Sequence, residues 1–117
     1  MRGLTIIVAS PGNGLRTALE LVSVQCALEG RARLFVHGVA VAQLMSPAPD
    51  DALYVEHGQG MRADALAIAL DLGVEVIACQ SGLALVGATL AACDLRIVAG
   101  GLVGLIATLG DDRLVTL

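Results

Sequence analysis

The sequence contains no lysine and no tryptophan, and Phe35 and Tyr54 are its only phenylalanine and tyrosine. The 7 basic residues, all of them arginines, are outnumbered by 11 acidic residues, so the net charge is −4 at pH 7. Surfaces that bind nucleic acids usually combine clustered basic side chains with aromatic rings on which bases stack. We therefore expect no nucleic-acid partner for this chain.

Charge of either sign is scarce. Only 15% of the residues are charged, whereas 56% are hydrophobic and the mean hydropathy is +0.82. These values lie well on the apolar side of an average soluble domain. A chain of 117 residues exposes much of its surface, and there are too few charges to cover it. We expect a homo-oligomer, a dimer or trimer, that buries apolar surface between copies. The alternative is an apolar monomer of low solubility.

Long apolar segments are also missing. The apolar run after Arg2 ends at the loop residues 10–12, which is too short for a signal peptide. The longest stretch without a charge covers residues 76–93, but Gln80, Ser81 and Gly87 divide it into a strand and a helix. We therefore expect no membrane span. A cytoplasmic location with reduced thiols fits this composition.

The three cysteines, Cys26, Cys79 and Cys93, form no CxxC pair. The two histidines, His37 and His57, lie far from the cysteines in the sequence. Zinc sites usually show closely spaced cysteine or histidine ligands. We expect neither a metal nor another cofactor.

Short β-branched runs alternate with helical patterns along the whole chain, and no linker divides it. This alternation is typical of an α/β fold with a mainly parallel sheet of about five strands, here in one domain, residues 1–117. The strands are expected at residues 4–9, 32–36, 74–78, 95–98 and 113–117, with a minor strand at 53–55. Helices are expected at residues 15–29, 39–44, 61–72, 83–86, 89–93 and 102–109.

Cys79 follows directly after the apolar run 74–78 and precedes Gln80, Ser81 and Gly82, which read as the start of a helix. In an open parallel sheet, reactive groups lie at the carboxyl ends of strands. The free amides and the dipole at a helix start favour a thiolate over a thiol. The sequence thus predicts a partly accessible nucleophilic thiol at Cys79, with the amides of Ser81 and Gly82 near the sulfur. The alternative from position alone is a purely structural cysteine.

Two other segments are expected at the same edge of the sheet. The loop at residues 10–14 follows the first strand, but it carries neither GxGxxG nor GKS or GKT, the patterns of phosphate loops. Ser10, Asn13 and His37 are expected to line a pocket around Cys79, although His37 also fits a plain hydrogen-bonded loop histidine. Cys26 is expected to fill the core, and Cys93 is either a core residue or a second thiol.

Several segments together resemble the DsrE/DsrF-like family, which includes the TusD-type sulfur-relay proteins. The likeness covers almost the whole chain in order and spacing. It rests on residues 6–10, the helix segment 17–21 ending at residues 29–30, residues 34–39, residues 73–79 with Cys79, Gly87, residues 95–98 and 100–102, and the ending at 112–117.

The resemblance implies a three-layer α/β/α Rossmann-like sandwich that assembles as an oligomer. It also implies that Cys79 carries a persulfide, because the matching cysteine does so in the sulfur-relay members. The function expected on this basis is a sulfur-relay persulfide carrier, a possible sulfurtransferase, with protein donors and acceptors of sulfur. The alternative is a non-catalytic oligomeric protein of the same fold that binds a small ligand.

Overall fold

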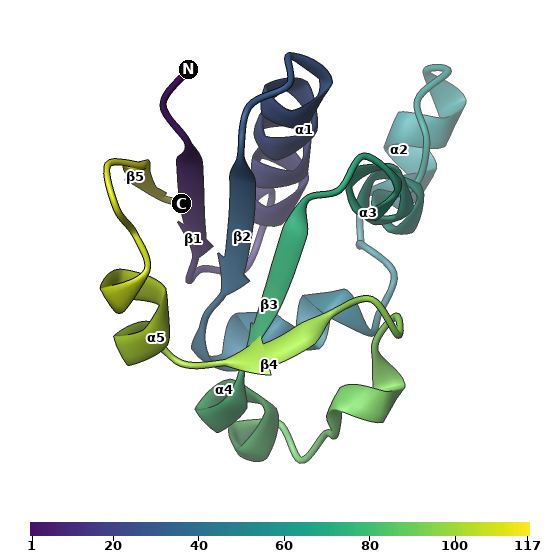
Figure 1. Ribbon diagram of the computed structural model, residues 1–117. Coiled ribbons are helices and arrows are strands. Elements are labelled where there is room, and N and C mark those ends of the chain that lie inside the picture. Colours follow the sequence, from purple (N-terminus) through teal and green to yellow (C-terminus); the bar gives the residue numbers. More distant parts are fainter.

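A computed structural model describes residues 1–117, and its five strands form one sheet in the order β4-β3-β2-β1-β5 (Figure 1). The strands are β1 (Leu4–Val8), β2 (Ala32–Val36), β3 (Glu75–Cys79), β4 (Val98–Gly100) and β5 (Arg113–Thr116). Every neighbouring pair is parallel, and helices lie on both sides of the sheet, which confirms the expected α/β/α sandwich. All carboxyl ends of the strands therefore lie at one edge.

The helices connect these parallel strands, as parallel pairing requires. They are α1 (Gly14–Ala27), the 3₁₀ helix η1 (Gly38–Leu44), α2 (Asp51–Glu56), α3 (Arg62–Asp71), α4 (Gln80–Leu85), the 3₁₀ helix η2 (Leu90–Ala92) and α5 (Leu102–Ala107). Six of them are the helices expected from the sequence, whereas α2 is not.

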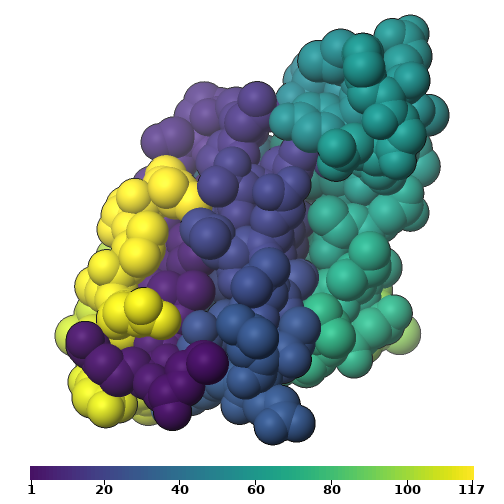
Figure 2. Space-filling view, turned by 90° about the horizontal axis from the view of Figure 1, so that it is seen from above, coloured from purple at the N-terminus to yellow at the C-terminus, as the bar shows by residue number.

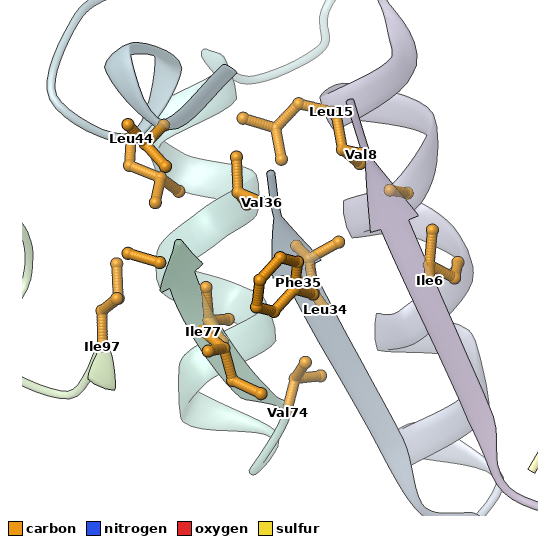
Figure 3. Close-up of a cluster of buried hydrophobic side chains, with 14 of the residues drawn as sticks. Ile6, Val8, Leu15, Leu34, Phe35, Val36, Leu44, Val74, Ile77 and Ile97 are labelled. Atoms are coloured by element: carbon orange, nitrogen blue, oxygen red, sulfur yellow. The ribbon is translucent and has the colours of Figure 1, made fainter. Parts of the chain in front are cut away.

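The main core lies between the sheet and α1 with its neighbour α3. Side chains alternate between the faces of a strand, and the parallel register aligns Ile6 with Leu34 and Leu34 with Val76 on this face. Leu15 of α1 and Leu44 of η1 are buried with them, as the close-up shows (Figure 3). The apolar runs of the three central strands, β1, β2 and β3, are thus explained by burial on both faces of the sheet.

A buried polar network holds α5 on the opposite face of the sheet. The guanidinium of Arg33 on β2 donates to the Thr5 hydroxyl (3.1 Å), to the Thr108 hydroxyl (2.7 Å) and to the Leu105 carbonyl (3.2 Å). The Thr5 hydroxyl donates in turn to Asp112 (2.9 Å). Because Arg33 has Asp112 as a nearby counter-charge (3.8 Å), its burial is balanced.

The minor strand expected at residues 53–55 is wrong, because this segment belongs to helix α2. The carboxylate of Asp51, in the first turn of α2, accepts the Ala48 amide (2.9 Å) and pairs with Arg16 of α1 (2.7 Å). The Arg16 guanidinium also lies 3.7 Å from the centre of the Tyr54 ring. These contacts fix a helical turn where the short apolar run alone suggested a strand.

The strand expected at residues 95–98 begins only at Val98. Asp94 forms a turn before it, since its side chain accepts the Arg96 amide (2.9 Å) and its carbonyl accepts the Ile97 amide (3.0 Å). Leu95 lies in this turn and is 94% exposed. The other four main strands match their expected positions to within one residue.

The first and last strands of the chain, β1 and β5, lie side by side in parallel, so the N-terminus and the C-terminus lie at opposite ends of this strand pair. The space-filling view shows the first residues, in purple, against the last ones, in yellow, while the teal segment around α2 forms the opposite corner (Figure 2). None of the helices combines the length and the apolar character needed to cross a membrane.

Candidate functional site

Cys79 is the last residue of β3 and the residue that caps the amino end of α4. Its neighbours in the sheet are β2 on one side and β4 on the other, where Cys79 pairs with Gly100. The structure therefore places Cys79 where the sequence predicted it, at the carboxyl end of a strand. The expected partial accessibility is wrong: Cys79 is only 3% exposed, because η1 and α4 close over the end of β3.

Hydrogen-bond donors converge on the sulfur of Cys79. The Gly82 amide donates to Sγ (3.3 Å), and the Ser81 hydroxyl lies 3.4 Å from it. Burial is the largest single influence and by itself raises the pKa of the thiol. The Ser81 hydroxyl and the amides of Gly38, Gly82 and Ser81 together outweigh it and hold the pKa of Cys79 below its ordinary value. The site thus favours a thiolate without a nearby cation.

The two glycines at this site touch through their backbones. A Cβ added to Gly82 would lie 2.2 Å from the carbonyl oxygen of Gly38, far inside van der Waals contact. Gly38 itself adopts a φ of 58°, in the left-handed region that glycine tolerates best. Close packing of η1 against α4 therefore depends on both glycines, and it brings the Gly38 amide to the sulfur.

His37 follows β2 in an extended conformation. The register aligns Val36 with Ala78, so the next residues, His37 and Cys79, are neighbours on the same face of the sheet. The His37 ring stacks on Phe35 at 6.1 Å, and its Nδ1 is buried without a hydrogen-bond partner. The Nδ1 of His37 is thus a buried polar atom without a protein partner at the carboxyl edge of the sheet.

Ser10 and Asn13, expected around Cys79, belong to a different part of the edge. Asn13 lines a hollow together with Gln43 and Arg62. The Ser10 carbonyl accepts a hydrogen bond from the side-chain amide of Gln43 (3.2 Å). Cys79 is not among the residues that line this hollow. The residues predicted to line one pocket therefore fall into two groups. One group contains Cys79, Ser81, Gly82 and His37. The other contains Ser10 and Asn13.

Three residues of these groups were not anticipated from the sequence: Gly38, Gln43 and Arg62. A glycine two residues after the end of the second strand was the only local signal for Gly38. Gln43 and Arg62 reach the edge through the path of η1 and the start of α3, which the sequence pattern does not specify. The structure brings together no group of three or more His, Cys, Asp or Glu side chains that would suit a metal ion.

The other two cysteines lie in surroundings unlike those of Cys79. Cys93 is buried, as a core residue is, and burial raises the pKa of its thiol. Cys26 was expected to be buried but is only half-buried, against the edge of the core. Burial still raises the pKa of Cys26, and the Ala32 amide offsets this only in part.

Alkylation measured across pH is expected to separate the three thiols. The rate at Cys79 should rise with a midpoint below about 8.5, the value of an ordinary cysteine, because its thiolate is stabilised. The midpoints at Cys26 and Cys93 should lie above that value. The midpoint is compared rather than the rate, since half-buried Cys26 is easier to reach than Cys79. A lower midpoint at Cys26 or Cys93, determined by mass spectrometry of the labelled peptides, would refute the assignment.

Comparisons with known proteins show the fold of the chain. No protein-family model and no curated protein matches it. Among solved structures, the crystal structure of the ychN protein from E. coli is similar, with a TM-score of 0.73 and 23% sequence identity over 100% of both chains. The likeness extends over the full length of each chain.

Proposed function

We propose that the protein is a sulfur-relay protein that carries sulfane sulfur as a persulfide on Cys79. The observation that carries the proposal is the convergence of donors on one sulfur atom: the Ser81 hydroxyl, the Gly82 amide and the Gly38 amide. A lowered thiol pKa is what nucleophilic attack on a sulfur–sulfur bond requires. Neither a metal nor an oxidant takes part in this chemistry.

The transfer is a thiol exchange in two steps. The Cys79 thiolate attacks the outer sulfur of a donor persulfide, R–S–SH. A bond forms between Sγ and the outer sulfur, the donor's S–S bond breaks, and the donor leaves as the thiolate R–S⁻, which takes a proton from solvent. An acceptor thiolate then attacks the outer sulfur of the Cys79 persulfide, and Cys79 leaves as a thiolate. The amides of Gly82 and Gly38 are placed to stabilise the charge on Sγ before and after each step.

The proposal includes a local movement. With Cys79 only 3% exposed, little of the sulfur is open to a donor. The short helices η1 and α4 cover it, and displacement of either one opens the end of β3. Such an opening requires only local unfolding, which costs less free energy than unfolding of the whole domain.

We further propose that the chain is a member of the DsrE/DsrF-like family. The full-length likeness in fold to the ychN protein supports this, as does the position of Cys79 at the end of β3. A reduced thiol at the centre of the proposal agrees with a cytoplasmic location.

Intact-mass spectrometry after incubation with a low-molecular-weight persulfide tests the proposal. Wild-type protein is expected to gain about 32 Da, the mass of one sulfur atom, and to lose it on treatment with a thiol reductant. No mass gain with any persulfide donor, together with a rise in melting temperature caused by an unrelated small molecule, would favour the alternative function, a ligand-binding protein without sulfur chemistry.

We also propose that the protein acts as a homo-oligomer, with α5 in the contact between copies. This helix contains no charged residue, and its Leu102, Val103 and Ile106 are exposed, Val103 by 86%. Stable interfaces bury such apolar surface. Sedimentation at micromolar concentration should give a multiple of 11.9 kDa, and Val103→Glu should shift it toward the single-chain mass with the fold intact. A wild-type mass of one chain would contradict this proposal.

A further inference from the structure

A second site lies apart from Cys79, at the carboxyl end of β1. A hollow of about 360 Å³ opens there between the loop at residues 11–13, which leads into α1, and the segment that joins η1 to α2. Asn13, Gln43, Ser46, Asp50 and Arg62 contribute polar groups to its lining. An adjoining hollow of about 370 Å³ shares Gln43, Ser46 and Arg62 with it and is lined mostly by hydrophobic side chains.

Arg62 is the unusual member of this lining. It is only 5% exposed, yet no carboxylate lies within salt-bridge distance of its guanidinium. Its partners are neutral oxygens: the Gln43 side chain (3.2 Å), the Gln43 carbonyl (3.3 Å) and the Ser46 carbonyl (3.2 Å). A guanidinium has five N–H donors, so two remain without a protein acceptor. Buried charges in proteins are normally paired.

The nearest buried carboxylate is already used by another arginine. Asp51 pairs with Arg16 (2.7 Å) and also accepts the main-chain amides of Arg62 (2.8 Å) and Ala48 (2.9 Å). Two buried guanidinium groups, those of Arg16 and Arg62, thus share one buried carboxylate. The Nε of Arg16 is itself buried without a hydrogen-bond partner. Asp51 therefore leaves the guanidinium of Arg62 without a direct carboxylate partner, although the charges of Asp51 and Asp50 both act on it from a longer distance.

The amino end of α1 adds a positive electrostatic potential at the same hollow. Asn13 caps the 14-residue helix without using its side chain as a cap, and the first turn contains no acidic residue. The first amides of a helix have no intrahelical acceptor, and the helix dipole makes them favourable for an anion. Asp50 is the one opposing charge in the lining; it is half-buried and forms no salt bridge.

We propose that this hollow binds a small oxyanion, a phosphate or carboxylate group, between Arg62 and the amino end of α1. The two free donors of Arg62 and the unused side-chain amide of Asn13 supply its hydrogen bonds. The site is independent of Cys79 and of sulfur transfer, since it shares no lining residue with the Cys79 group.

NMR titration with inorganic phosphate in one arm and acetate in the other, at constant ionic strength, tests the site. At least one anion should bind with a Kd of about 1 mM or tighter, with the largest shifts in the amides of residues 12–14. The arm that saturates first identifies the phosphate or the carboxylate as the preferred group. Absence of saturable shifts in both arms would overturn the proposal.

Charge variants distinguish a built site from general electrostatic attraction. Asn13→Asp should weaken anion binding at least fivefold, although a carboxylate at this capping position favours the helix and leaves the fold intact. Asp50→Asn should strengthen binding. Asp111→Asn, which makes the same change in net charge on an exposed residue outside the lining, is the matched control and should have no effect. Equal effects of Asp50→Asn and Asp111→Asn would contradict a specific site.

Discussion

Cys79→Ser is expected to abolish the uptake of sulfane sulfur while the fold and the assembly stay unchanged. A serine hydroxyl does not accept sulfur from a persulfide, so the gain of about 32 Da should vanish. The structure indicates why folding survives: Cys79 caps α4, where serine is a preferred residue. The stability change should stay within about 1 kcal/mol, as measured by denaturant unfolding.

Cys93→Ser is the matched control for this substitution. Cys93 is also buried, but no hydrogen bond lowers the pKa of its thiol. The variant should keep most of the sulfur uptake. If Cys93→Ser and Cys79→Ser lost uptake equally, Cys93 would take part in the relay. Full uptake by Cys79→Ser would refute the role of Cys79.

Gly82→Ala is expected to damage both the fold and the reactivity of the site. The added methyl group would lie 2.2 Å from the Gly38 carbonyl oxygen and 2.8 Å from its carbonyl carbon, and both are backbone atoms that cannot swing aside. The start of η1 must move, at a cost of about 1–3 kcal/mol. The same movement separates the Gly38 amide from Sγ, so the thiol pKa of Cys79 should rise.

Denaturant unfolding and the pH profile of Cys79 alkylation measure these two effects. Gly104→Ala in α5 is the control, provided that its sedimentation matches the wild type, because a Cβ there meets no atom of the same chain within 4 Å. Alanine in a helix is more favourable than glycine, so this control should be neutral or stabilising by up to about 1 kcal/mol. A Gly82→Ala protein with wild-type stability and an unchanged midpoint would mean that the contact between η1 and α4 does not control the thiol.

Sheet and layers could be predicted from the sequence because the three central strands, β1, β2 and β3, are largely buried on both faces. Their β-branched runs are continuous, and the helical segments between them enforce parallel pairing. Helix α2 was missed for the opposite reason. Its few apolar residues carry no clear period, and its helical form depends on Asp51 pairing with Arg16, 35 positions earlier in the chain. Local patterns contain no record of such a contact.

At the candidate site, too, local features could be predicted from the sequence and long-range contacts could not. The position of Cys79 followed from the strand before it and the helix start after it, so one local segment was sufficient. Its burial did not follow, because η1 comes from the end of a different strand and closes over the sulfur through Gly38. Ser10 and Asn13 do lie at the expected edge of the sheet, but β2 and η1 stand between them and β3. Sequence order alone could not separate the two groups.

Locating the transferred sulfur by tandem mass spectrometry tests the central claim most directly. Wild-type protein is loaded from a persulfide donor, blocked by alkylation and digested. Trypsin leaves Cys79 and Cys93 together on the peptide of residues 63–96, because the chain has no cleavage site between Arg62 and Arg96, so fragment ions must assign the sulfur. We expect the additional mass of about 32 Da, one sulfur atom, on Cys79. Its presence on Cys26 or Cys93, with Cys79 unmodified, would contradict the account.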